Sequence, residues 1–322
     1  MSVWPNSAFA FFLVSLLASC GGSGPGDTGD NEPMPSPSPA PAMPTPTPAP
    51  TAIAGACPSD TFLAVDGVAA AGDGYAPTEL SVACEDDTMV VHSNGIPPYE
   101  FVATTPNELE VNEQEYRIPL GAQPAAEISE LPLLGTIAVA VNGVPIFGPN
   151  EGPNPDPFGD PIVNAILDVC GAHTARGGIY HYHELWDACL GGEADSEQPS
   201  PILGWALDGF PIYGPQACLD TDCTDIRTMQ SGWENTGTEA GTEGCTSNAP
   251  CSEGFYCALT RLGGTLTTAC SPRNYSWENN EFVGVEADAT VLDQCNGRVG
   301  PDGTYRYHAT RTFPYVMGCY RG

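Results

Sequence analysis

Two segments of this chain each occur twice, and this repetition restricts the folds that the chain can adopt. Ile166–His183, "ILDVCGAHTARGGIYHYH", aligns without a gap with Val291–His308, "VLDQCNGRVGPDGTYRYH". Val139–Pro149, "VAVNGVPIFGP", aligns in the same way with Trp205–Pro215, "WALDGFPIYGP". We call the shorter segments A and the longer ones B, so their order along the chain is A, B, A, B. Self-similarity of this kind predicts two copies of one structural unit.

Each copy of the unit is predicted to be mainly β. Both A segments are apolar, β-branched or aromatic runs that end in Gly-Pro, which is the pattern of a strand followed by a turn. The chain also contains 37 Gly and 33 Pro, which disfavour long helices. We therefore expect a mainly β domain in which two copies, roughly 135–190 and 202–322, pack about a pseudo-two-fold axis.

The cysteines predict disulfides. Of the 13 cysteines, 12 remain when Cys20 is set aside, an even number that suits an oxidising compartment. Their positions favour the local pairs Cys57–Cys84, Cys170–Cys189 and Cys295–Cys319, with a Cys170–Cys295 cross-link as the alternative. An insertion at about 216–274 is expected to form three more disulfides, because it is too small for an apolar core of its own. Its cysteines are Cys218, Cys223, Cys245, Cys251, Cys257 and Cys270.

The first 56 residues are expected to lie outside the folded domain, 57–322. Phe9–Leu17 is an apolar run too short to span a bilayer, and Leu17–Cys20 matches a bacterial lipobox in which Cys20 is lipidated. Residues 1–20 thus predict a lipoprotein signal on an outer-membrane or cell-surface protein that faces outward or into the periplasm. No basic residue precedes the apolar run, so a plain secretory signal or a misplaced start codon are the alternatives. The Pro-, Ser-, Thr- and Ala-rich residues 21–56 predict an extended linker.

The charge restricts the partners. Forty acidic residues face nine basic ones, all of them Arg, and the formal net charge is −31. Such a charge repels nucleic acid and anionic lipid, so we expect no nucleic-acid partner and membrane contact only through the lipid anchor. It is compatible with divalent metals and equally with an acidic surface that keeps an exported protein soluble. Whether the partner is a small molecule or a cell surface stays open.

The "YHYH" stretch suggests a metal site. In a strand, His181 and His183 would share one face, roughly 7 Å apart, while Tyr180 and Tyr182 would point into the core. A Gly-bearing turn brings His173 back towards them, and the pseudo-symmetry is expected to bring His183 and its repeat mate to the axis. Imidazoles suit copper or zinc, and the affinity order favours copper. The predicted ligands of one transition-metal ion are His173, His181, His183 and His308.

Acidic and basic residues near these histidines have several possible roles. Asp168 and Asp293 are expected to hydrogen-bond the ring nitrogens that do not bind the metal. Arg298 and Arg306 replace two histidines in the second B segment, which favours a single asymmetric metal site. The two arginines either recognise an anionic substrate or pair with these aspartates. The alternative for the histidines and tyrosines is a buried hydrogen-bond network without a metal.

A calcium site is a weaker candidate. The alternating acids of Asp220–Asp225 resemble a calcium loop, but they lack the Gly and the distal Glu of an EF-hand.

Several ordered motifs resemble those of the YHYH protein family. The resemblance extends from about Ser81 onward and rests on "SNGIP", "NGVPIFGP", "LDVCGAH", "YHYH", "GWALDGFPIYG" and "YRYHATRTFPYVMGCYRG". The chain departs from the family pattern at Arg306, within "YRYH", and at Pro98, where a histidine is expected. The resemblance implies an exported domain that contains repeats, and it leaves the chemistry to the residues.

These patterns favour three functions. The first is a surface lipoprotein that binds copper or zinc for metal handling or metal-dependent chemistry. The second is a metal-dependent oxidase or hydrolase, with Tyr180 or Tyr182 as redox partner, or Asp208 or Glu184 as base. The third is a non-enzymatic, disulfide-rich module for ligand binding or adhesion, in which the histidines are structural.

Overall fold

In the computed structural model, the described residues lie within one compact unit, Pro50–Gly322. The described residues are 57–152, 159–192, 197–235, 255–262, 265–272, 277, 279–284 and 288–322. The predicted signal and linker, with Cys20, lie outside them, as do Cys245 and Cys251. Side chains of 255–262 and 265–272, which include Cys257 and Cys270, are likewise not described.

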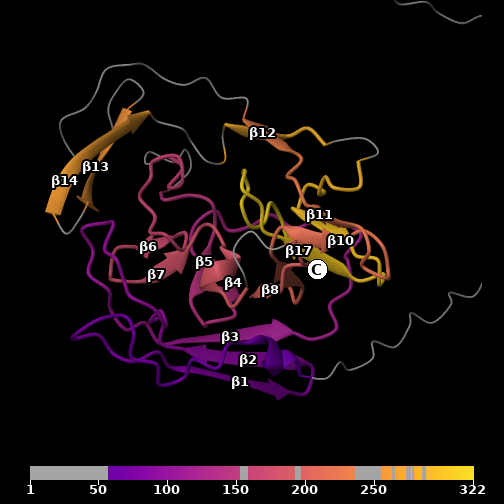
Figure 1. Ribbon diagram of the computed structural model, residues 1–322, viewed down its shortest axis with the longest axis horizontal. Coiled ribbons are helices and arrows are strands. Elements are labelled where there is room, and N and C mark those ends of the chain that lie inside the picture. Colours follow the sequence, from indigo (N-terminus) through magenta and orange to yellow (C-terminus); the bar gives the residue numbers. More distant parts are fainter. Residues whose placement is uncertain are drawn as a thin grey trace, which may run out of the picture. The chain divides into compact units, whose positions relative to one another are not determined.

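The prediction of a mainly β fold is confirmed (Figure 1). The described residues contain no α-helix, and their helical content is two short 3-10 turns, η1 (Pro58–Thr61) and η2 (Asp187–Cys189). The frequent Gly and Pro explain this, because both residues destabilise helix interiors. The same part of the chain has no helix of sufficient length and apolar character to cross a membrane.

The largest sheet has eight strands in the order β16-β17-β9-β8-β4-β5-β7-β6. Its strands, in chain order, are β4 (Thr136–Ala140), β5 (Pro145–Phe147), β6 (Ala172–Thr174), β7 (Tyr180–Tyr182), β8 (Ile202–Ala206), β9 (Pro211–Tyr213), β16 (Gly297–Val299) and β17 (Tyr305–His308). The A segments supply the four central strands, and the B segments supply two strands at each end of the sheet.

The central pairing separates the two B segments. Strand β4 lies antiparallel to β8 with Val139 opposite Trp205, which are equivalent positions of the two A segments. Strand β5 then pairs in parallel with β7, and β9 pairs in parallel with β17. Four strands therefore lie between β7 and β17. The expected meeting of His183 and His308 at the axis does not occur, because the A segments pair with each other there. The duplication itself stays a prediction.

The remaining sheets are small. One contains β1 (Leu80–Glu85), β2 (Thr88–Ser93) and β3 (Gln114–Pro119). Two strand pairs lie within the predicted insertion: β10 (Gln216–Cys218) with β11 (Ile226–Thr228), and β13 (Phe255–Leu262) with β14 (Thr265–Pro272). A further strand of the insertion, β12 (Trp233–Asn235), pairs with β15 (Asn280–Phe282), which follows the insertion.

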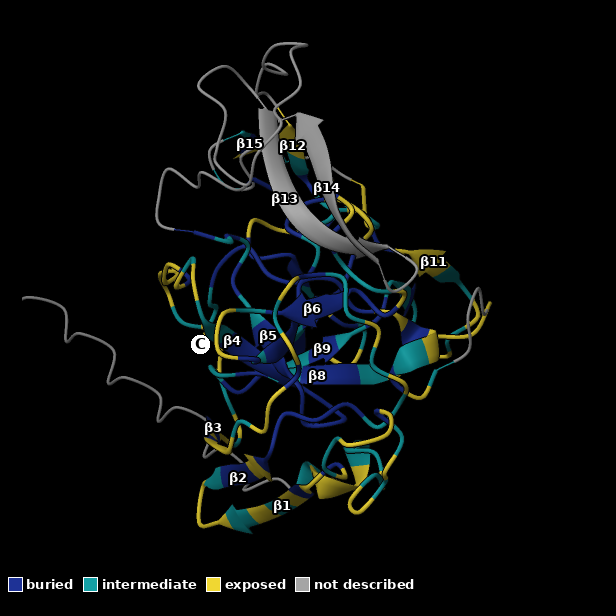
Figure 2. Cartoon of the chain, turned by 90° about the vertical axis from the view of Figure 1, so that its left-hand side faces the viewer, coloured by how far each residue is buried: buried dark blue, intermediate teal, exposed yellow. Residues whose placement is uncertain are grey.

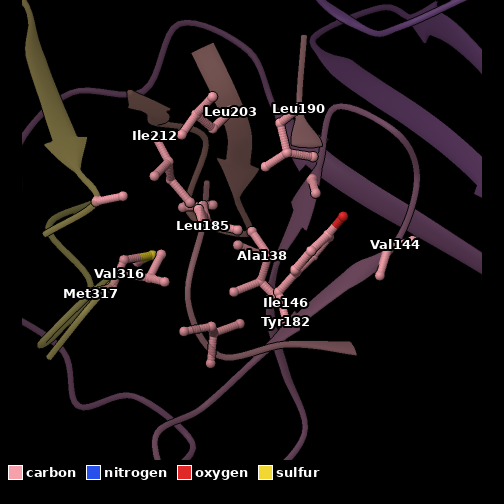
Figure 3. Packing of buried hydrophobic residues seen from close by; sticks show 14 of the residues in the cluster. Ala138, Val144, Ile146, Tyr182, Leu185, Leu190, Leu203, Ile212, Val316 and Met317 are labelled. Atoms are coloured by element: carbon pink, nitrogen blue, oxygen red, sulfur yellow. The ribbon is translucent and has the colours of Figure 1, made fainter. Parts of the chain in front are cut away.

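The main hydrophobic core lies around the central strands of the large sheet, which Figure 2 shows as buried. Ala138, Ile146, Leu203 and Ile212 are each fully buried, one from each of the four central strands, and the close view includes Tyr182 among them (Figure 3). Burying a side chain such as Leu or Ile stabilises the fold by about 1.5–3 kcal/mol. The two tyrosines of β7 pack into this core, and His181 projects from the other face of the strand.

Four disulfides join described residues. Three are the expected local pairs, Cys57–Cys84, Cys170–Cys189 and Cys295–Cys319, and the alternative Cys170–Cys295 link is not formed. The fourth, Cys218–Cys223, lies in the insertion. Stable disulfides form in oxidising compartments, so these four indicate an exported protein.

Candidate metal centre

The β6–β7 hairpin places two histidines directly opposite each other. Its register pairs His173 with His181, and their Nε2 atoms are 3.1 Å apart. Gly177 and Gly178 form the connecting turn at φ angles of +91° and +78°, a region that residues with a Cβ rarely adopt. The predicted turn across "TARGG" therefore folds as expected and brings His173 back onto the strand.

His183 joins this pair from just beyond the end of β7. Its Nε2 lies 2.9 Å from Nε2 of His181, as the strand alternation predicts, and its backbone N–H donates to the Gly171 carbonyl. Gly171 is required at this point, because a Cβ there would lie 2.4 Å from the Glu184 carbonyl oxygen. All three histidine side chains are buried.

Glu151 completes the group, although the sequence patterns did not predict it as a ligand. It follows β5, the parallel neighbour of β7, and its Oε1 lies 2.7 Å from Nε2 of His183 and 3.2 Å from Nε2 of His173. Burial acts to raise the pKa of the Glu151 carboxyl, but the adjacent His173 and His183 outweigh it and hold that pKa well below its usual range. The sequence contains one indication of this role. Glu151 lies two residues after the first A segment, whereas Ala217 occupies the equivalent position after the second.

The donor atoms of these four residues fit a single metal ion. One ligand atom from each of Glu151, His173, His181 and His183 lies within 4.8 Å of the others. The four distances given above run from 2.7 to 3.2 Å. Ligands about 2.0 Å from an ion are about 2.8 Å apart at the corners of a square and about 3.3 Å apart in a tetrahedron. The observed spacing spans these two arrangements.

Hydrogen bonding leaves Nε2 of His181 ready to bind a cation. Nδ1 of His181 lies 3.0 Å from the Ile179 carbonyl, which can only accept, so Nδ1 carries the proton and Nε2 offers its lone pair. Burial, followed by the neighbouring His173 and His183, holds the pKa of His181 well below its usual value. His181 is therefore neutral at neutral pH, which is the form that binds metals.

The two predicted supporting aspartates do not contact these rings. Asp168 accepts hydrogen bonds from the backbone of Cys170 and from the Tyr180 hydroxyl, and Asp293 does the same with Cys295 and Tyr305. Both carboxylates therefore stabilise the turns of the B segments. Nδ1 of His173 and of His183 are buried and have no hydrogen-bond partner among the described residues.

His308 is not part of this group. It lies on β17, at the other end of the sheet, and its Nδ1 lies 2.9 Å from the Gly214 carbonyl. Arg298 and Arg306 lie near it, and all three line one pocket. The ligand set that the structure assembles thus contains three of the four predicted histidines and Glu151 in place of the fourth.

The tyrosines of the "YHYH" stretch form their own network on the core side of the strand. The hydroxyl of Tyr99 lies 2.5 Å from that of Tyr182 and 3.2 Å from that of Tyr180. The buried Asn142 amide donates to the Tyr182 hydroxyl at 2.9 Å. The expectation that Tyr180 and Tyr182 point into the core is confirmed.

The two candidate bases are engaged elsewhere. The carboxylate of Asp208 accepts from the backbone N–H groups of Arg321 and Gly322 and from the Tyr307 hydroxyl, which fastens the C-terminal residues. Glu184 accepts from Trp186 at 3.1 Å and from Arg311 at 3.4 Å, while burial raises the pKa of its carboxyl.

The acids of the candidate calcium loop do not converge either. Asp220 accepts hydrogen bonds from Thr224 and Asp225 within its own exposed loop. The cluster at Glu151 is the one group of metal-binding side chains found in the described residues.

The fold and the site define an exported, disulfide-bonded β protein with a buried cluster of three histidines and a glutamate that can hold a metal ion. The model of one protein family, described as "YHYH protein", matches residues 115–322. This match covers more than half of the chain, and the chain belongs to the YHYH protein family. Among curated proteins and solved structures, no match to the chain was found.

Proposed function

We propose that this protein is a surface lipoprotein that binds one transition-metal ion through Glu151, His173, His181 and His183. The observation that carries the proposal is the convergence of four donor atoms within 4.8 Å in a buried site. Without a cation, the Nε2 atoms of three imidazoles would face one another and one carboxylate in a region of low dielectric. Such an arrangement is costly unless a positive charge balances it.

Copper is the first candidate for this ion and zinc the second. The donor spacing of 2.7–3.2 Å suits both the tetragonal geometry of Cu²⁺ and the tetrahedral geometry of Zn²⁺. Because geometry leaves both open, the general affinity order decides, and it places Cu²⁺ above Zn²⁺ for nitrogen and oxygen ligands.

The site favours holding the metal over catalysis at an open coordination position. Four protein side chains already supply a full ligand set for zinc or for tetragonal copper. The cavity that adjoins His183 measures only about 10 Å³, which is too small for an organic substrate. The tyrosine hydroxyls and the Asp208 carboxylate hydrogen-bond to groups outside the cluster. We therefore propose metal binding or handling at the cell surface.

Competition titrations test the metal. The purified protein would be titrated with Cu²⁺ and with Zn²⁺ in the presence of a chelator of known affinity. The expected result is one site per chain with tighter binding of copper. Weak or multi-site binding of both metals would contradict the proposal, and tighter binding of zinc would overturn the order of the two metals alone.

Cell fractionation tests the anchor. The full-length chain and a Cys20→Ala variant would be expressed in a bacterium that processes lipoproteins. We expect the parent chain to be found in the membrane fraction and the Cys20→Ala variant to be released from it. Identical fractionation of the two chains would contradict lipidation at Cys20.

A further inference from the structure

A pocket with both apolar and charged side chains in its lining lies at the end of the large sheet opposite to the metal centre. Its volume is about 220 Å³, and its lining includes Tyr213, Arg298, Asp302, Arg306 and His308. In the repeat alignment, Arg298, Arg306 and His308 take the places of the three histidines of the metal centre. The same β-hairpin geometry that gathers metal ligands at one end therefore gathers two cations and an imidazole at the other.

The two arginines repel each other across the hairpin. The antiparallel register of β16 and β17 places Arg298 directly opposite Arg306. Like charges in this position destabilise a sheet. Arg306 is compensated by Asp302 and lies over the Tyr213 ring at 4.9 Å from its centroid. Arg298 forms no ion pair with any described residue, and its Nη1 contacts Met229 Sδ at 3.4 Å.

His308 adds a buried acceptor without a partner. Its Nδ1 lies 2.9 Å from the Gly214 carbonyl, which can only accept, so Nδ1 carries the proton. Nε2 is buried and has no hydrogen-bond partner among the described residues, and the side chain lines the pocket. Burial, followed by the charges of Arg298 and Arg306, lowers the pKa of His308 to about 4, so the ring is neutral at neutral pH.

We propose that this pocket binds a small oxyanion that carries a hydroxyl group, with inorganic phosphate as the simplest member of that class. Its charged oxygens would accept hydrogen bonds from the guanidinium groups of Arg298 and Arg306. Its hydroxyl would donate to Nε2 of His308, which otherwise stays unsatisfied. Sulfate has the same shape and charge but no hydroxyl at neutral pH, so the pocket should discriminate against it.

The acidic side chains in the lining of this pocket do not prevent it from binding an anion. Asp302 is the partner of Arg306, and Asp220 is held by hydrogen bonds from Thr224. The binding site for the anion is also independent of the metal centre, because four strands separate β17 from β7.

Calorimetric titration of the purified, metal-free protein with sodium phosphate and sodium sulfate tests the inference. One phosphate per chain is expected to bind, with sulfate weaker by about tenfold or more, because sulfate has no hydroxyl to donate to the buried Nε2 of His308. Arg298→Gln and Arg306→Gln should each weaken phosphate binding by about tenfold or more, because each variant removes charge-assisted hydrogen bonds to the anion.

Matched variants keep the test specific. Arg117→Gln removes an equal charge from an exposed position on β3 and should leave phosphate binding unchanged. His181→Ala/His183→Ala removes the metal ligands and should also leave it unchanged, which separates this site from an anion bound to the metal centre. Absence of saturable phosphate binding would overturn the inference. Equal binding of sulfate and phosphate would overturn the role given to His308, and circular dichroism would confirm that each variant is folded.

Discussion

His173 lies directly opposite His181 in the β6–β7 hairpin, with the two Nε2 atoms 3.1 Å apart. A hairpin register is fixed by the backbone, so it brings these two ligands together before any metal binds. The equivalent hairpin of the second B segment places Arg298 opposite Arg306 in the same way. One backbone arrangement thus presents imidazoles at one end of the sheet and guanidinium groups at the other.

Replacing Glu151 tests whether the carboxylate is a ligand. Glu151→Gln keeps the size of the side chain but removes its charge, so we expect copper affinity to fall by at least about 10–100-fold, the range for loss of a residue that only supports a ligand. Chelator competition would measure it. The matched control is Glu115→Gln at an exposed position on β3, which should bind copper as the parent does. An unchanged affinity in Glu151→Gln would remove Glu151 from the ligand set.

Replacing Tyr182 separates the tyrosine network from the metal site. Tyr182→Phe deletes the hydroxyl that contacts Tyr99 and leaves the fully buried Asn142 amide without this acceptor. The expected cost is about 1–3 kcal/mol in the free energy of unfolding, measured by denaturant titration. Metal content should stay at the parent level, because the hydroxyl lies on the opposite face of β7. Loss of the metal in a folded Tyr182→Phe protein would contradict this separation.

Much of the metal centre follows from local sequence. Strand alternation predicts that His181 and His183 share a face while Tyr182 enters the core, and the Gly-bearing turn predicts the return of His173. The local disulfides follow from cysteines that bracket each B segment. All of these features depend on residues close together in the chain, where a short turn or the period of a strand fixes the geometry.

Glu151 and His308 could not be placed in this way. Glu151 reaches the site because β5 pairs in parallel with β7, and this pairing depends on the whole order of the sheet. His308 was expected beside His183 on the assumption that the B segments meet at the axis. The A segments pair at the centre instead, through Val139 and Trp205, and carry the B segments outward.

The Cys170–Cys189 disulfide closes a longer loop than Cys218–Cys223, with sequence separations of 19 and 5 residues. Loop-closure entropy predicts that removing the first destabilises the protein by about 3 kcal/mol and removing the second by about 2 kcal/mol. Paired Cys→Ser variants, unfolded in denaturant, would check the order. A larger loss of stability on removal of Cys218–Cys223 would show that the entropy of the unfolded chain does not determine what each disulfide contributes.

His308 predicts a loss of stability in acid. Its pKa falls from 6.5 in the unfolded chain to about 4 in the folded protein, so only the unfolded chain takes up the proton between these values. The contribution of His308 to the free energy of unfolding is complete above pH 6.5, and it decreases as the pH falls towards 4. The loss can reach about 3 kcal/mol, since one pKa unit corresponds to about 1.4 kcal/mol.

Unfolding titrations at pH 7 and pH 4.5 would measure this loss in phosphate-free buffer. The His308→Gln variant should lose less stability between the two pH values than the parent, because it has no group to titrate at this position. The charges of Arg298 and Arg306 stay constant over this range. Equal losses in parent and variant would contradict the shifted pKa of His308.

Metal content tests most directly whether the histidine cluster binds a metal ion. The protein would be purified from an oxidising compartment and its bound metals counted by mass spectrometry, beside the His181→Ala/His183→Ala variant. We expect close to one equivalent of copper or zinc in the parent and none in the folded variant. A parent that holds no metal, even after reconstitution with Cu²⁺ and Zn²⁺, would contradict it and make the histidines of the "YHYH" stretch structural.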